Sequence, residues 1–294
     1  MYRPVLFGVF LTLVCFVASS AALAKPGRMH FVFDMDDTII RWVHPGEKPG
    51  GTILPGEGDI DGYRYRVLDG APEIIASILH DYPDALISFD SAGPRERNLR
   101  ILSELMLPDG RSAKDIAYRI LSKEDLPPDG KKDLRKVLAP GDRIEDVILL
   151  DDHTQFSELH QEWNLLWVGA KPELHEVEVG DAGARPDAIP EFLKDRNKLV
   201  RARGLIDRMI ALANARDISL SEALDFLQWG PKVPGPIEYR SKLQTDLDLY
   251  RSGLRDFVRV NPRFRFTTAL PGLTSIGCVG YRLRLLLLKA NRAN

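Results

Sequence analysis

The segment Val32-Phe33-Asp34-Met35-Asp36-Asp37-Thr38 decides how this chain is interpreted. It continues the apolar run 29–33, which predicts a buried strand, and it places three carboxylates within four residues. Carboxylates this close repel one another unless a cation lies among them. Because Mg²⁺ prefers carboxylate oxygens and an aspartate can act as a covalent nucleophile, the segment indicates a magnesium-assisted aspartyl nucleophile.

Apolar runs alternate with amphipathic ones from residue 29 to residue 168, which is typical of a parallel sheet flanked by helices. The expected strands are 29–35, 85–88, 116–121, 146–150 and 165–168, and the expected helices are 71–80, 95–106 and 132–138. We therefore expect an α/β fold with a doubly wound (Rossmann-like) parallel sheet. In such sheets ligands bind beyond the carboxyl ends of the strands. Five polar residues fall at those ends: Asp34, Asp36, Ser88, Asp151 and Asp152.

These motifs resemble those of the haloacid dehalogenase superfamily of phosphohydrolases over residues 29–169. They stand in the superfamily's order: Asp34 to Thr38, Ser88, Lys132, and then the pair Asp151-Asp152. The spacing is most similar to the capless branch that includes the RNA polymerase C-terminal-domain phosphatases. In that branch a short hairpin follows the first motif, as 60–67 does here, and the lysine opens a Lys-Asp-Leu turn. The resemblance implies a phosphatase with an open site, which suits a large phosphorylated substrate.

The resemblance also implies a role for each carboxylate. Asp34 attacks phosphorus to give an aspartyl-phosphate, and Asp36 protonates the leaving oxygen and later takes a proton from water. The expected metal ligands are Asp34, the carbonyl of Asp36, and Asp152, with Asp151 acting through water or more remotely. Mg²⁺ is thus the expected cofactor.

Three further residues are expected to act on the phosphoryl group. Ser88 donates to a phosphoryl oxygen, Lys132 neutralises the charge that develops there, and Thr38 braces the substrate-binding loop without itself reacting. Alternatives remain open for two of them: Asp90 or Ser91 in place of the serine, and Lys131 or Lys123 in place of the lysine.

The first 24 residues predict a signal peptide. Arg3 is followed by an uncharged apolar core, and Ala22-Leu23-Ala24 forms a small-x-small cleavage site. The alternative is a single membrane anchor, for which the apolar core is short. The mature protein is then expected to be periplasmic or secreted, without a stable membrane span. Its net charge moves from −2 to −3, because Arg3 is the sole charged residue of the leader, and this does not suggest nucleic acid as a partner.

The remaining chain predicts a catalytic domain at 25–175 and a mainly helical C-terminal extension at 176–294. Helical spacing is expected over 189–216, from a capping box at 219–222 toward 227, and over 242–258. No motif in this extension names a ligand. The alternative to a phosphatase is a non-catalytic binding protein that uses the C-terminal helices as a partner surface. The presence of Asp34, Asp36 and Asp152 favours the enzyme.

Overall fold

The computed structural model describes residues 27–43, 51–54, 64–168, 198–229 and 247–264. The expected signal peptide, residues 169–197 and the last thirty residues lie outside these ranges. Within them, no helix combines the length and the apolar character needed to span a bilayer.

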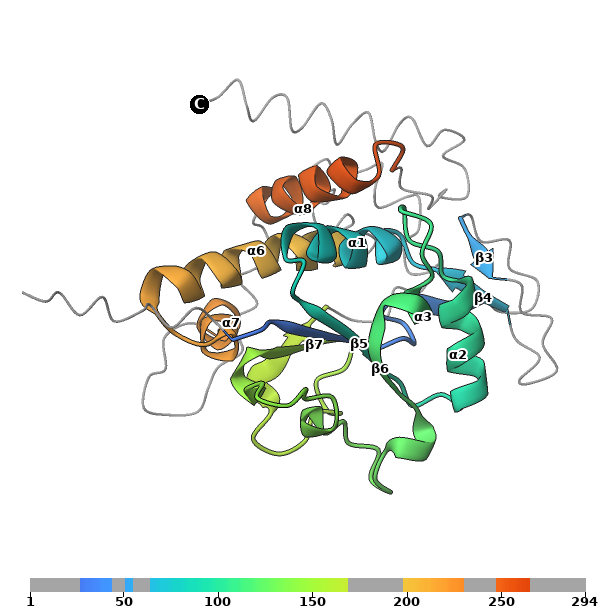
Figure 1. Ribbon diagram of the computed structural model, residues 1–294, viewed down its shortest axis with the longest axis horizontal. Helices are drawn as coiled ribbons and strands as arrows, with labels where there is room; N and C mark the ends of the chain where they lie inside the picture. The colour runs from blue at the N-terminus through green and yellow to red at the C-terminus, as the bar shows by residue number, and fades with distance from the viewer. Residues whose placement is uncertain (1–26, 44–50, 55–63, 169–197, 230–246, 265–294) are drawn as a thin grey trace, which may run out of the picture.

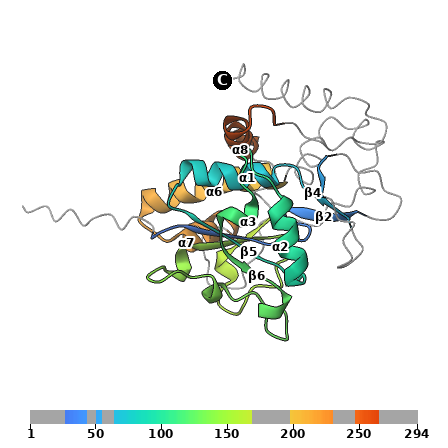
Figure 2. The same cartoon turned by 45° about the vertical axis from the view of Figure 1, so that its right-hand side comes forward.

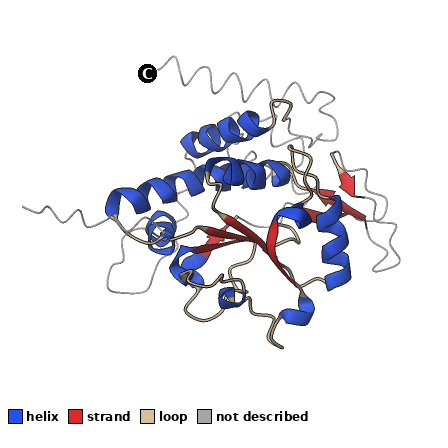
Figure 3. Ribbon diagram, viewed as in Figure 1, coloured by secondary structure: helices blue, strands red, loops and turns tan. Residues whose placement is uncertain are grey.

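The centre of the fold is a five-stranded parallel sheet in the order β6-β5-β1-β7-β8 (Figure 3). Its strands are β1 (His30–Phe33), β5 (Leu86–Asp90), β6 (Ala117–Leu121), β7 (Val147–Asp151) and β8 (Leu165–Trp167). The expected α/β fold with a parallel sheet is therefore confirmed. Apart from the edge strand β6, the strands are rich in buried apolar residues because both faces of the sheet are covered there.

Two details differ from the expectations. The strand predicted to end at Ser88 continues to Asp90, because Phe89 pairs with Phe33 and keeps the ladder intact. The helix expected at 132–138 is a single 3₁₀ turn, Leu134–Lys136. Residues 60–63 of the expected hairpin lie outside the described residues, and its remainder is β4 (Arg64–Val67). This strand belongs to a three-stranded antiparallel sheet after the first motif, in the order β2 (Ile40–Val43), β4 and β3 (Ile53–Leu54).

Helices cover the sheet in two groups. On one face, α1 (Ala71–Asp81) and α6 (Lys198–Arg216) pack side by side, and α8 (Leu247–Val260) lies against both of them (Figures 1 and 2). The helices α2 (Arg95–Glu104) and α3 (Ala113–Ile116) contact each other near β5 and β6, and α7 (Leu220–Trp229) packs against β7 and β8. The C-terminal helices therefore share one apolar core with the sheet.

The crossing of α6 and α8 is close because a glycine stands at the contact on each helix. A Cβ built on Gly204 would lie 2.0 Å from the carbonyl oxygen of Leu249, and one built on Gly253 would lie 1.9 Å from that of Val200. One residue before Gly204, Arg203 is fully buried and bonds to Asp81 of α1 and Asp207 of α6. Since a buried charge is tolerated only when it is paired, these contacts hold α6 at one position over the sheet.

Candidate active site

The site begins where three neighbouring strands end. Phe33 of β1 pairs with Phe89 of β5 on one side and with Leu150 of β7 on the other. The next residue of each strand is an aspartate, so Asp34, Asp90 and Asp151 lie at the same level of the sheet. Each is at most 5% exposed. Three carboxylates this close need a cation among them.

Lys132 supplies one such cation. Its Nζ lies 2.7 Å from Oδ1 of Asp34 and 2.6 Å from Oδ2 of Asp151, and the side chain is 3% exposed. The backbone of Lys132 is fixed by hydrogen bonds with Phe156 and Glu158, which hold the loop beside β7. The two alternative lysines lie elsewhere: Lys131 donates to the carbonyl of Gln155, and Lys123 is exposed. Of the three lysines, Lys132 is therefore the one whose ammonium contacts Asp34, the predicted nucleophile.

Lys132 alone does not balance the cluster. Burial raises the pKa of Asp34, and the attraction of Lys132 acts in the opposite direction. The compensation is incomplete, because Asp151 pairs with the same ammonium. Burial and the surrounding carboxylates act in opposite directions on the pKa of Lys132, and the net effect is a raised value. An ionised Asp34, which a nucleophile requires, therefore needs a further positive charge nearby.

Asp36 follows Asp34 by two residues; its side chain is 41% exposed and is held by Arg97 of α2. The guanidinium forms a two-pronged ion pair: Nη1 lies 2.9 Å from Oδ1 and Nη2 2.6 Å from Oδ2 of Asp36. Ser91 donates to the same carboxylate across 2.9 Å. Arg97 is itself fixed by the side-chain oxygen of Asn98.

Gly93 makes room for Arg97. A Cβ built on this glycine would lie 1.8 Å from Nη2 of Arg97, so a larger residue would displace the guanidinium. Tyr65 of β4 stacks on the other side, with its ring centre 5.4 Å from Cζ of Arg97. The small antiparallel sheet thereby helps to position the arginine that holds Asp36.

Asp152 follows Asp151 and is braced by Thr38. The backbone N–H of Asp152 donates to Oγ1 of Thr38 across 3.1 Å, and that hydroxyl donates to Oδ1 of Asp152 across 3.4 Å. Thr38 is fully buried, which agrees with a bracing position. Among the described residues Oδ2 of Asp152 accepts no hydrogen bond, although Nδ1 of His153 lies 3.1 Å away.

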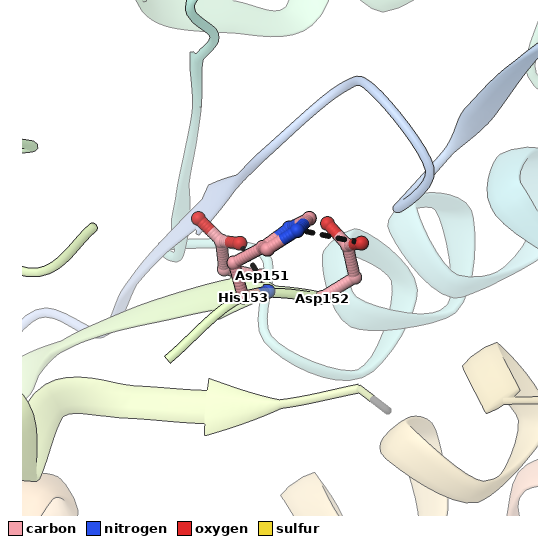
Figure 4. A group of neighbouring side chains, drawn as sticks. All are labelled: Asp151, Asp152 and His153. Carbon is pink, nitrogen blue, oxygen red and sulfur yellow. Dashed lines mark hydrogen bonds and ion pairs between the residues drawn. The ribbon is translucent and has the colours of Figure 1, made fainter. Parts of the chain in front are cut away.

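The donor set fits a divalent cation. Asp151, Asp152 and His153 offer ligand atoms within 4.8 Å of one another, as Figure 4 shows. Carboxylate oxygens are the ligands that Mg²⁺ prefers, and a buried carboxylate oxygen without a hydrogen bond is costly unless an ion binds it. Burial raises the pKa of Asp152, which is the direction expected when the positive charges around a buried carboxylate do not fully compensate it.

Ser88 does not join this cluster. It lies inside β5, paired with Val32, and so stands two residues deeper in the sheet than Asp34. Its Oγ lies 2.8 Å from Nε2 of His30 and accepts from the backbone N–H of Arg119 across 3.2 Å. The positions that β5 brings to the site are Asp90 and Ser91, which the sequence left open as alternatives.

Asp90 is unusual because it is fully buried and neither of its carboxylate oxygens has a hydrogen-bond partner within the described part of the chain. Burial raises its pKa to about 6, although Lys132 acts in the opposite direction. The sequence predicted the phosphate-binding hydroxyl of Ser88 at this end of β5. In the structure the last residue of the strand is Asp90, which adds a carboxylate to the site.

Lys198 is a site residue that the sequence did not predict. It begins α6, 164 positions after Asp34, and its Nζ donates to the carbonyl oxygen of Asp37. The side chain is 5% exposed, and burial lowers its pKa while Asp152 has the largest opposing effect. Arg97 was missed too, since it occurs in an ordinary amphipathic helix. No local pattern marks either residue, because only the fold brings them to the carboxylates.

Comparison with known proteins gave matches to solved structures alone: no family model and no curated protein matches this chain. One is the fission yeast RNA polymerase II CTD phosphatase Fcp1, as a single-residue variant bound to beryllium fluoride. It is 13% identical, with a TM-score of 0.44, over 76% of this chain and 80% of that one. A second structure of Fcp1 is 15% identical, with a TM-score of 0.43, over 77% of this chain and 79% of that one.

Proposed function

We propose that this chain is an exported, Mg²⁺-dependent phosphomonoester hydrolase that works through an aspartyl-phosphate on Asp34. The observation that carries the proposal is the position of Lys132, whose Nζ contacts both Asp34 and Asp151 at the carboxyl end of the sheet. Ligands bind at this end in open α/β sheets, and a buried ammonium next to a nucleophilic carboxylate suits an incoming phosphoryl group.

The residues divide the reaction into two steps. In the first, an oxygen of Asp34 forms a bond to phosphorus as the bond to the leaving oxygen breaks, and Asp36 gives that oxygen a proton. In the second, Asp36 takes a proton from water, which attacks phosphorus and releases phosphate from Asp34. Arg97 and Ser91 hold Asp36 in place, and Lys132 offsets the negative charge on the phosphoryl oxygens.

The proposed metal ligands are Asp34, the backbone carbonyl of Asp36, and Asp152, with Asp151 nearby. When bound, Mg²⁺ would supply positive charge that keeps Asp34 ionised and that offsets the charge of the phosphate. Thr38 supports this arrangement by fixing Asp152.

A direct assay tests the proposal. The protein from residue 25 onward is assayed with an aryl phosphate, once with Mg²⁺ and once with EDTA. The variant Asp34→Asn is assayed in the same way, and the surface variant Asp109→Asn is the matched control. We expect metal-dependent release of phosphate that falls by at least about 10³-fold in Asp34→Asn and is unchanged in the control. A folded protein that hydrolyses neither this substrate nor a panel of larger phosphorylated molecules would refute the proposal and favour the non-catalytic binding protein.

Export is tested separately. Mass spectrometry of the protein recovered outside the cytoplasm should give an N-terminus at Lys25. Recovery of membrane-bound protein that retains Met1 or Tyr2 would contradict cleavage after Ala24.

A further inference from the structure

The C-terminal extension contributes a charged side chain to the site. Lys198 stands at the first position of α6, and it is the part of this helix that reaches the loop after β1. It donates to the carbonyl oxygen of Asp37, the residue between the proposed acid/base Asp36 and the brace Thr38. Asp37 has a φ of 56°, a left-handed conformation that non-glycine residues seldom adopt, so this carbonyl is held at some cost.

The position of Lys198 is fixed by the rest of α6. Leu199 and Val200 are buried next to it, and Arg203 is tied to α1 through Asp81. The close contact of Gly204 with α8 limits sliding of the helix. Since the side chain is itself 5% exposed, its ammonium cannot move into solvent without displacing packed neighbours.

The charge of Lys198 acts on the carboxylates proposed to bind Mg²⁺. Burial lowers the pKa of Lys198, and the carboxylates that act in the opposite direction are Asp152, then Asp37 and Asp34. A fixed positive charge beside such a group has two effects. It relieves the repulsion among the carboxylates when no metal is bound, and it repels a divalent cation that approaches them.

We propose that Lys198 is the contribution of the C-terminal extension to the active site, where its ammonium braces the loop at Asp37 and weakens the affinity of the carboxylates for Mg²⁺. This inference rests on the proposed function, because it requires the metal site. It assigns α6 a role in setting the metal affinity of a site whose proposed metal ligands lie more than forty residues earlier in the chain.

The test measures binding and does not depend on turnover. Isothermal titration with MgCl₂ and thermal unfolding with and without Mg²⁺ are carried out on the chain from residue 25 onward, as wild type, Lys198→Gln and Lys198→Arg. The exposed Lys114→Gln removes the same charge from the surface of α3 and serves as the control. We expect Lys198→Gln to bind Mg²⁺ at least about fivefold more tightly, and the other two variants to stay within about twofold of wild type.

The unfolding curves add a second readout. Mg²⁺ should raise the melting temperature of Lys198→Gln by a larger amount than that of wild type. Equal or weaker Mg²⁺ binding by Lys198→Gln overturns the inference and leaves the lysine with a structural role. Lys198→Met, which keeps the apolar stem, replaces the glutamine variant if that one does not fold. If neither neutral variant folds at any Mg²⁺ concentration, the inference is likewise overturned.

The same titrations distinguish an error in the proposed function from an error in the inference on Lys198. If neither wild type nor Lys198→Gln binds Mg²⁺, the metal site itself is refuted. If wild type binds weakly or not at all and Lys198→Gln binds, the inference is supported directly.

Discussion

Replacing Asp90 with asparagine should stabilise the protein more at pH 8 than at pH 5. Asp90 is fully buried beside Asp34, and burial raises its pKa from 3.8 to about 6. Because the folded protein holds this proton more tightly than the unfolded chain does, the stability that Asp90 contributes is complete below pH 3.8 and is lost as the pH rises through about 6. Asparagine has nearly the same shape and does not titrate.

The magnitude follows from the two pKa values. A shift from 3.8 to about 6 corresponds to about 3 kcal/mol of lost stability at pH 8, where both states are ionised. At pH 5 the loss is roughly half as large, because the folded state remains mostly protonated there. The gain in the free energy of unfolding on Asp90→Asn should therefore be about 1–2 kcal/mol larger at pH 8 than at pH 5.

Urea unfolding of both proteins at the two pH values measures this difference. Any effect of Asp90→Asn on packing is the same at pH 5 and pH 8, because the asparagine amide does not titrate. It therefore cancels when the two pH values are compared. Asp109→Asn is the control of opposite sign, because a hydrogen bond from Arg111 lowers the pKa of that surface carboxyl. An equal effect of Asp90→Asn at pH 5 and pH 8, or a larger one at pH 5, would refute the burial argument.

Three other substitutions test separate parts of the structure. Gly93→Ala should displace Arg97 from Asp36 and lower kcat by at least about tenfold, with the melting temperature changed by only a few degrees. Steady-state kinetics and calorimetry measure these two quantities, and an unchanged kcat would show that Arg97 does not position Asp36. Ser88→Ala should cost about 1–2 kcal/mol in urea unfolding, because it removes the partner of His30, and should leave KM unchanged. Arg203→Met should destabilise the protein by about 2–4 kcal/mol by leaving Asp81 and Asp207 without their buried partner, and a loss below about 1 kcal/mol in the same assay would contradict this.

The positions of the strands along the chain could be predicted because each strand is a short apolar run with polar residues at its carboxyl end. The same pattern predicted Asp34, Asp151 and Asp152 at one edge of the sheet, since parallel strands end at the same edge. It misplaced the end of β5, because Phe89 and Asp90 continue the ladder beyond Ser88 and a buried aspartate is rare inside a strand.

Arg97 and Lys198 could not be predicted. Charged residues on amphipathic helices usually face solvent, and nothing in their local sequence distinguishes these two from their neighbours. Arg97 reaches the site because Gly93 leaves space for it, and Lys198 does so because α6 is packed against α1 and α8. Both depend on contacts between segments that are distant in the chain. Lys132 differs from them in standing within a local pattern, Lys132-Asp133-Leu134, that is visible in the sequence alone.

The place of Lys198 in the chain has a consequence for biosynthesis. The carboxylates at Asp34 and Asp152 leave the ribosome before α6 has been made, and N-terminal segments generally begin to fold first. At that stage the acidic cluster can pair with Lys132 but not yet with Lys198. The growing chain should therefore depend more on Mg²⁺ than the finished protein does. Refolding of the full chain from urea tests the compensation behind this expectation: Mg²⁺ should accelerate refolding more in Lys198→Gln than in wild type, and equal acceleration would show that Lys198 and Mg²⁺ do not act on the same carboxylates.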